Sequence, residues 1–184
     1  MTNADAGSNG EGEEGTTTAA VTADWAAVYA ATLPRVYNYF RFRTGDNALA
    51  EDLTAATFEK AWQGRATYCH DRAAFTTWLF TIARHEAASY FRRPRGREVP
   101  LDHARACHDA WSVEDEVARR DDLARLVALL GQLPAREREL IELKYGAELT
   151  NRAIAQLTGL SESNVGTLLG RVVHRLAKVW EETP

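Results

Sequence analysis

The segment from Thr150 to Leu176, TNRAIAQLTGLSESNVGTLLGRVVHRL, most narrows what this chain can fold into. Thr150 and Ser161 stand where helix N-caps would stand, because each hydroxyl can accept a backbone N–H that has no partner at a helix start. Gly159 lies between them, where a residue free to adopt a positive φ is needed. Apolar residues are spaced to close a small core between two helices: Ile154, Leu157, Leu160, Val165, Leu169 and Val172. The pattern predicts a helix-turn-helix, a motif whose second helix enters the DNA major groove.

Helical spacing of apolar residues also marks the first half of the chain. It runs through residues 24–44, 47–62 and 75–93, with a stop at Thr44–Gly45 and a capping residue, Asp46 or Asn47, before the second run. No long alternation of apolar and polar residues appears, so no strand is expected. Aromatic residues at this spacing, such as Trp62 and Trp78, are expected in the core.

Composition divides the chain into four parts. Residues 1–22 consist of small, polar and acidic residues and are expected to form a disordered acidic tail. Residues 94–113 contain two prolines and little periodicity, which indicates a flexible linker. The predicted fold class is all-α, with two small helical domains, 23–93 and 114–184, the second of which contains the helix-turn-helix.

The net charge of −4, from 22 basic and 26 acidic residues, is unusual for a protein that holds DNA by itself. Residues 1–22 contribute −4, residues 23–93 contribute +2 and residues 114–184 contribute −2. Neither half is strongly basic, and few phosphates would be neutralised. A weak DNA binder that relies on a larger partner fits this balance. There is no apolar span of membrane length and no signal-peptide pattern, so a cytoplasmic protein without membrane insertion is expected.

Three runs in the chain resemble a known family: AEDLTAATFEKAW (Ala50–Trp62), AFTTWLFTIARHEAASYFRR (Ala74–Arg93), and LPARERELIELKYGAELTNRAIAQLTGLSESNVGTLLGRVVHRL (Leu133–Leu176). In this order they are similar to the extracytoplasmic-function sigma factors, the smallest specificity subunits of bacterial RNA polymerase. The resemblance covers nearly everything from Asp24 to Trp180. It implies a factor that directs core polymerase to specific promoters and helps open the minus-ten DNA, with core RNA polymerase, promoter DNA and an anti-sigma factor as partners.

The resemblance also implies three contact surfaces. The helix 51–62 would dock on the polymerase clamp, the loop 68–72 would hold a base flipped from the minus-ten strand, and the helix starting at Ser161 would bind the minus-thirty-five duplex. Arg84, Arg92 and Arg93 could meet phosphates, and His85 replaces the family's usual Asn on the strand-reading face. The residues expected at the core-polymerase contact are Glu51, Asp52, Thr54 and Phe58. Those expected at the minus-ten DNA are Tyr68, His70, Arg72, Arg84, His85 and Arg92. Those expected at the minus-thirty-five DNA are Ser161, Ser163, Asn164, Thr167, Arg171 and His174.

Some positions depart from the family pattern. Ala55 and Ala56 remove two polar groups from the expected clamp contact, and Gly166 and Leu168 replace two cations of the recognition helix. A weaker minus-thirty-five contact, or one that depends on DNA shape, is therefore expected. Two alternatives stay open: a free-standing helix-turn-helix regulator, and a sigma-derived adaptor that lacks promoter recognition.

Catalytic and metal sites are not expected. No nucleophile–base pair, phosphate-binding glycine loop or carboxylate pair is recognisable, so the chain is not expected to be an enzyme or to need a cofactor. A zinc site would have to combine ligands from the helical part with ligands from the linker. The residues concerned are Cys69, His70, His85, His103, Cys107 and His108.

Overall fold

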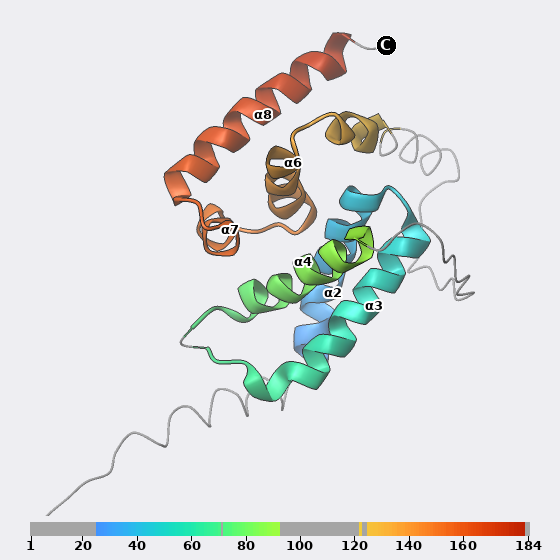
Figure 1. Ribbon diagram of the computed structural model, residues 1–184, viewed down its shortest axis with the longest axis vertical. Coiled ribbons are helices and arrows are strands. Elements are labelled where there is room, and N and C mark those ends of the chain that lie inside the picture. The colour runs from blue at the N-terminus through green and yellow to red at the C-terminus, as the bar shows by residue number, and fades with distance from the viewer. Residues whose placement is uncertain (1–24, 71, 93–121, 123–124, 183–184) are drawn as a thin grey trace, which may run out of the picture.

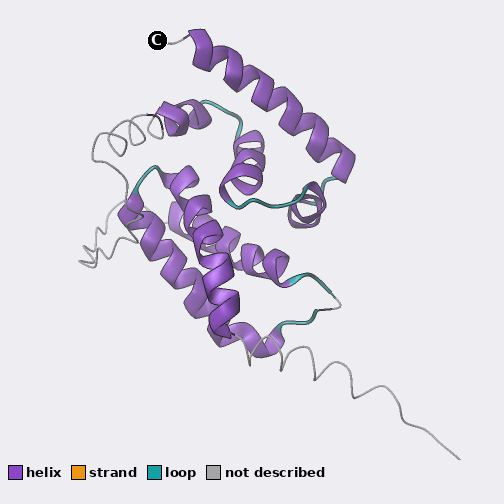
Figure 2. Cartoon of the chain, turned by 180° about the vertical axis from the view of Figure 1, so that it is seen from behind, coloured by secondary structure: helices purple, strands orange, loops and turns teal. Residues whose placement is uncertain are grey.

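The computed structural model consists of helices joined by short turns (Figure 1). It describes residues 25–70, 72–92, 122 and 125–182. No strand occurs among these residues, as Figure 2 shows, and the all-α prediction is confirmed for them. They form an N-terminal unit, residues 25–92, and a C-terminal unit, residues 125–182. The predicted acidic tail, 1–22, and the predicted linker, 94–113, lie outside the described residues.

The N-terminal unit contains three long helices. They are α2 (Trp25–Thr44), α3 (Asn47–Gly64) and α4 (Phe75–Arg92), with a short 3-10 turn, η1 (Arg65–Thr67), after α3. Gly45 ends α2 with a φ of +70°, and the Asp46 carboxylate caps α3 by accepting a hydrogen bond from the Leu49 N–H at 3.1 Å. The predicted stop at Thr44–Gly45 is confirmed, and of the two predicted capping candidates, Asp46 and Asn47, Asp46 is the cap.

Most of the apolar faces of these helices meet in the core. Val36, Phe40, Leu79 and Phe80 are completely buried. Trp62 is an exception, because 42% of it is exposed and the Arg65 guanidinium stacks on its ring at 3.8 Å. The expectation that Trp62 belongs to the core is therefore wrong: it lies in the last turn of α3 and contacts the Trp25 ring, with 5.2 Å between ring centroids, but stays partly open to solvent.

The C-terminal unit begins with a helical segment, 125–131, and continues with the predicted helix-turn-helix. Its elements are α6 (Ala135–Ile141), η2 (Glu142–Gly146), α7 (Asn151–Thr158) and α8 (Glu162–Glu182). α6 begins directly after Pro134. It changes into a single π-helical turn, η2, which the sequence did not predict; such turns often mark functional positions.

The two units pack directly on each other. η2 lies against α2 and α7 lies against α4, so the buried residues of both units form one continuous cluster. α8 packs on α6 and α7 and lies on the side of the C-terminal unit that faces away from α2, α3 and α4 (Figure 1). Among the helices that the structure describes, none is long and apolar enough to cross a membrane.

Candidate nucleic-acid interface

The helix-turn-helix has the local geometry that its sequence predicts. The Thr150 hydroxyl accepts a hydrogen bond from the Ala153 N–H at 3.2 Å, and the Ser161 hydroxyl accepts one from the Asn164 N–H at 3.2 Å. Gly159 ends α7 in the left-handed region, with φ +72°. Both caps and the turn are therefore confirmed, and they fix the direction in which α8 leaves the turn.

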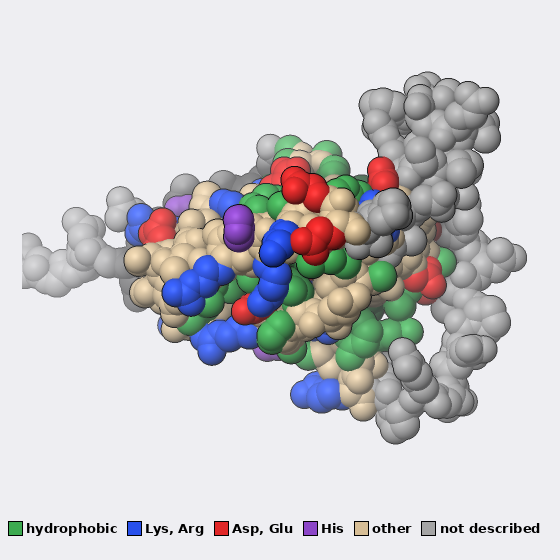
Figure 3. Space-filling view, turned by 90° about the horizontal axis from the view of Figure 1, so that it is seen from above, with side chains coloured by type: hydrophobic (Ala, Val, Ile, Leu, Met, Phe, Trp, Pro, Cys, Tyr) green, Lys and Arg blue, Asp and Glu red, His purple; other side chains and the backbone are tan. Residues whose placement is uncertain are grey.

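All six residues predicted to bind the minus-thirty-five duplex are exposed on α8 or just before it. Ser161 is occupied as the N-cap, and the Thr167 hydroxyl donates to the Ser163 carbonyl at 3.0 Å. Of the six, the longer exposed side chains of Asn164, Arg171 and His174 are the best suited to the predicted contact with base edges. In the view from above, Lys, Arg and His side chains share the surface with Asp and Glu side chains (Figure 3). This mixture agrees with a modest attraction for phosphates.

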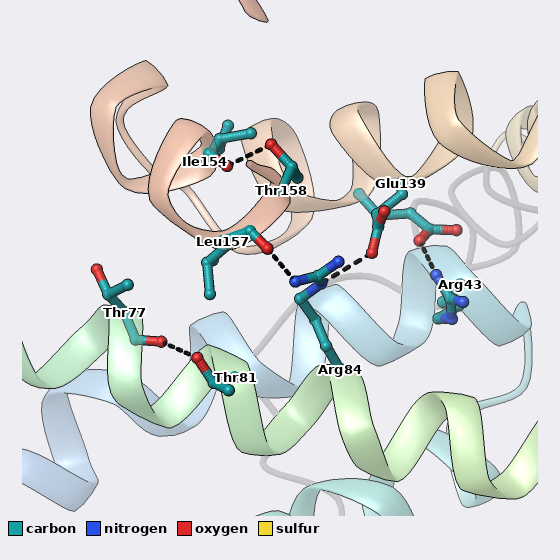
Figure 4. Close-up of polar contacts among 9 residues, drawn as sticks. Arg43, Thr77, Thr81, Arg84, Glu139, Ile154, Leu157 and Thr158 are labelled. Atoms are coloured by element: carbon teal, nitrogen blue, oxygen red, sulfur yellow. Dashed lines mark hydrogen bonds and ion pairs between the residues drawn. The ribbon is translucent and has the colours of Figure 1, made fainter. Parts of the chain in front are cut away.

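Arg84 was predicted to contact a DNA phosphate, and in the structure its guanidinium contacts the C-terminal unit. It extends from α4 to the C-terminal unit, where its Nε donates to the Glu139 carboxylate at 2.8 Å and its Nη1 donates to the Leu157 carbonyl (Figure 4). Leu157 is in the last turn of α7, so its carbonyl belongs to the negative end of that helix. Arg84 therefore bridges α4 to both α6 and α7 instead of facing open solvent.

The other residues predicted at the minus-ten DNA divide into exposed and buried ones. His70, Arg72, His85 and Arg92 are exposed. Tyr68 is only 3% exposed, and its ring packs against Phe75, Trp78 and the His70 ring. The Tyr68 ring therefore packs into the core beneath the loop, and burial raises the pKa of its hydroxyl.

Of the four α3 residues predicted to contact the polymerase, two are at least partly exposed and two are buried. Asp52 is exposed and Glu51 is partly exposed, so both can face a partner. Thr54 is 4% exposed and donates its hydroxyl to the Ala50 carbonyl at 2.6 Å, while the Phe58 ring packs on Tyr29 with 4.6 Å between ring centroids. The side chains of Thr54 and Phe58 therefore lie inside the unit, and of the four residues Glu51 and Asp52 are the two at its surface.

A buried ion pair joins the two units. The Arg43 guanidinium of α2 lies 2.5 Å from the Glu142 carboxylate of η2, whose side chain has no exposed surface. Burial raises the pKa of Glu142, and the attraction of Arg43 opposes that shift only in part. Removing one partner would leave the other charge buried and unpaired, at a cost of about 3–5 kcal/mol.

Sequence reasoning missed the residues of this contact between units. Arg35 donates to the carbonyls of Ala147 and Glu148 at 2.9 and 3.0 Å, which adds a second link from α2 to the turn after η2. One signal was available in the sequence: Glu142 stands inside the apolar run 140–143, and a charge on an apolar helix face needs a buried partner. The sequence held no signal for which arginine would be that partner.

A shallow groove of about 500 Å³ lies on the C-terminal unit. Its apolar floor includes Leu169 and Val173 of α8, with Tyr145 of η2 at one side, and Val173 and Tyr145 are 37% and 51% exposed. Lys144 and His174 supply polar atoms at the edge.

No group of three or more His, Cys, Asp or Glu side chains among the described residues is placed to hold a metal ion. The zinc alternative drew its remaining ligands from His103, Cys107 and His108, which lie outside the described residues.

Comparison with known sequences finds two matching family descriptions. Sigma-70 region 2 matches residues 28–98 and Sigma-70, region 4 matches residues 123–176. The ECF RNA polymerase sigma factor BldN of Streptomyces coelicolor is 32% identical over 146 residues, a match that covers 78% of this chain and 55% of BldN. The chain thus spans about half the length of that relative. The ECF RNA polymerase sigma factor SigM of Bacillus subtilis is 26% identical over 153 residues, covering 83% of this chain and 93% of SigM.

Two solved structures share the fold. CnrH, determined in complex with the cytosolic domain of CnrY, superposes with a TM-score of 0.62 at 21% identity, covering 93% of this chain and 99% of CnrH. The sigma factor RpoE of Bartonella quintana, determined with the anti-sigma factor NepR, gives a TM-score of 0.60 at 20% identity, covering 88% and 99% of the two chains. At these identities the likeness concerns the arrangement of helices.

Proposed function

The chain belongs to the extracytoplasmic-function sigma factors, and we propose that it directs core RNA polymerase to specific promoters and helps to open their minus-ten DNA. The observation that carries this proposal is the pairing, in one chain, of an exposed recognition helix, α8, with a second helix, α4, that presents His85 at its surface. The chain supplies recognition, and bond formation belongs to the polymerase.

The N-terminal unit is proposed to hold the melted minus-ten strand. His85 offers a ring that can stack on a base or bond to its edge, and Arg92 offers a charge for a phosphate. His70 and Arg72 border the loop before α4, where an extracted base would be received. Extracting a base costs a few kcal/mol, so several such contacts must act together.

The C-terminal unit is proposed to bind the minus-thirty-five duplex through α8. Asn164 suits adenine and Arg171 suits guanine, and each good pairing contributes about 1–3 kcal/mol of discrimination. Gly166 and Leu168 provide no charge on this helix, so binding by the isolated chain is expected to be weak. Most of the affinity of the complex for a promoter would therefore come from the polymerase.

Polymerase contacts are proposed at two places. Glu51 and Asp52 form an acidic edge on α3 that suits a basic surface of the clamp. The groove around Leu169 and Val173 suits an apolar helix of the flap. Control by an anti-sigma factor is proposed as well, in keeping with the family, and the bacterial cytoplasm is the proposed compartment.

Run-off transcription tests the proposal. Purified core polymerase is assayed with and without the protein on DNA fragments from upstream of its own gene. Specific initiation is expected, and His85→Ala and Arg171→Ala should each lower it about tenfold by removing a base contact. Lys178→Ala is the matched control on α8, because Lys178 is exposed and makes only a 3.9 Å pair with Glu182.

Other results would support a different function. Tight duplex binding by the protein alone, without initiation, would identify a free-standing regulator. Binding to core polymerase that is insensitive to Arg171→Ala, again without initiation, would identify an adaptor that has lost promoter recognition.

A further inference from the structure

Arg152 is the only lysine or arginine between residues 145 and 170, a stretch that holds all of α7, the turn and the first half of α8. It stands at the second position of α7 and is exposed. The acidic residues nearest to it along the chain are Glu148 and Glu162, and neither forms an ion pair with it within the described part of the chain. Arg152 therefore offers a positive charge that neither of these carboxylates neutralises.

The position of this charge is unfavourable for α7 itself. The N-terminus of a helix carries partial positive charge, so a cation in the first turn destabilises the helix. α7 has only eight residues, and its first turn contains no acidic residue that would offset this effect. A local rule that is broken without a compensating contact inside the protein is typical of a functional position. The charge of Arg152 therefore points to a partner outside the chain.

The start of α7 lies beside the first half of α8. A Cβ at Gly166 would lie 3.5 Å from the Asn151 Nδ2, and Asn151 directly precedes Arg152. Figure 1 shows α7 next to the end at which α8 begins. In a helix-turn-helix the second helix enters the major groove while the first helix crosses the DNA backbone. With α8 in the groove, the fold therefore brings Arg152 towards the flanking phosphates.

We propose that Arg152 contacts a phosphate beside the minus-thirty-five sequence, and that it supplies from α7 part of the positive charge that Gly166 and Leu168 do not supply from α8. This role of Arg152 rests on the proposed function, because it requires that α8 binds a promoter duplex. Contacts to phosphates fix position and carry no sequence information, whereas contacts to base edges do. Arg152 therefore adds affinity without selecting a sequence, and selection is left to residues such as Asn164.

Arg152→Gln tests the contact because it removes the charge and keeps a polar side chain. Each phosphate contact contributes about −0.9 to the slope of log K against log[salt], so the slope should become shallower by about 1. Binding at low salt should weaken about threefold. The loss should be equal for a native promoter fragment and for the same fragment with its minus-thirty-five bases scrambled. Asn164→Ala should instead weaken binding to the native fragment alone, because it removes a base contact and no charge.

The same substitution should make the protein more stable, because it removes a cation from the positive end of α7. The expected rise in Tm is about 1–3 °C. Lys178→Gln is the matched control, since it removes the same charge from the C-terminal part of α8, where a cation is favourable. It should change neither the affinity for DNA nor the salt slope, and it should not raise the Tm.

A second variant moves the charge to α8. Gly166→Lys in the Arg152→Gln background restores one cation beside the groove, and its Cβ would be in ordinary contact with the Asn151 amide. The salt slope should return to about the wild-type value. Recovery from the neighbouring helix would show that positive charge at this place strengthens binding, whichever of the two helices carries it.

The experiment uses holoenzyme assembled from core polymerase and each full-length variant. Filter binding measures the affinity for the native and scrambled fragments, taken from upstream of the protein's own gene, over a series of KCl concentrations. Differential scanning calorimetry of the free protein gives the Tm. Weaker binding to both fragments, a shallower slope and a higher Tm in Arg152→Gln, with recovery in the double variant and an unchanged Lys178→Gln control, would support the proposal.

Four results would overturn it. An affinity and a slope equal to those of the Lys178→Gln control would mean that Arg152 does not touch DNA. A loss confined to the native fragment would mean that Arg152 reads a base, and a loss with a lower Tm and an unchanged slope would assign it a structural role. A slope that Gly166→Lys does not restore would show that Arg152 does not stand in for charge missing from α8. Failure of the proposed function is recognised separately, because the wild-type protein would then form no holoenzyme that initiates transcription.

Discussion

Tyr39 is a completely buried residue with an unsatisfied polar group. It packs against Phe40 and Phe80, with ring centroids 5.1 and 5.7 Å away, at the place where η2 meets α2. Its hydroxyl has no hydrogen-bond partner among the residues that the structure describes. A buried hydroxyl without a partner lowers stability by about 1–3 kcal/mol relative to an apolar group of the same shape.

Tyr39→Phe is therefore expected to raise the free energy of unfolding by about 1–2 kcal/mol, because the ring stays and the unpaired hydroxyl is removed. Urea unfolding at pH 7 measures this change. Tyr90→Phe is the control, since Tyr90 is 42% exposed and should change stability by less than about 0.5 kcal/mol. A clear loss of stability in Tyr39→Phe would show that the hydroxyl is bonded, for instance to a water molecule.

Tyr39 should also make the free energy of unfolding depend on pH. Burial raises the pKa of Tyr39 above the value of about 10 for an unfolded tyrosine, and the nearby Arg43 guanidinium opposes this only in part. The folded state therefore resists losing this proton. The contribution of Tyr39 to the free energy of unfolding is fully present below about pH 10 and is lost as the pH rises further. The decrease of the free energy of unfolding above about pH 10 should therefore be smaller in Tyr39→Phe.

Residue-level prediction from the sequence succeeded where the signal was local. Thr150, Gly159 and Ser161 were identified because caps and turns depend on neighbours within four residues. Tyr68 and Phe58 were assigned to contacts with partners, yet the structure buries both. Periodicity does not show how far a neighbouring element extends over a side chain, so the boundary between core and surface could not be placed from spacing alone.

At the scale of elements, the helix-turn-helix depends on its caps. The Thr150 hydroxyl satisfies the Ala153 N–H at the start of α7, a helix of only eight residues. Without the cap, the Ala153 N–H would have to donate to water instead. A short helix that draws little stability from its own length is sensitive to such a loss.

Thr150→Ala is expected to lower the free energy of unfolding by about 1 kcal/mol, whereas Thr150→Ser should preserve it. Thr167→Ala is the matched control, because the Thr167 hydroxyl bonds to the Ser163 carbonyl within α8 and satisfies no free donor. Thermal unfolding followed by circular dichroism compares the three. An equal loss in Thr150→Ala and Thr167→Ala would mean that the cap contributes nothing specific.

The π-helical turn η2 illustrates an element that the sequence could not predict. The run 140–143 has ordinary helical periodicity, and nothing local indicates that the helix widens at Glu142. Its geometry follows from contacts with α2, which is about a hundred residues earlier in the chain: the Arg43 ion pair and the close approach of Gly146. Long-range contacts of this kind leave no spacing signal.

At the scale of the whole molecule, the two units share one core. Val36, Phe40 and Phe80 of the N-terminal unit belong to the same buried cluster as Leu140 and Ile154 of the C-terminal unit. Sequence reasoning predicted two helical domains joined by a linker, and it gave no indication of how closely they pack. A shared core couples the unfolding of one unit to that of the other, because each would expose apolar surface of its neighbour.

The wild-type protein is therefore expected to unfold in a single calorimetric transition, with a calorimetric enthalpy close to the van't Hoff value. Gly146→Ala should separate this into two transitions, since a Cβ pressed against the α2 backbone weakens the contact between units while leaving the interior of each unit unchanged. Gly131→Ala is the control and should keep the single transition, because a Cβ at Gly131 meets nothing within 4 Å. Two transitions in the wild type would mean that the units fold independently and that their contact adds little to the stability of either one. One transition in every variant would mean that the steric effect at Gly146 is absorbed within η2, so that separating the two units would require removal of the Arg84 contacts instead.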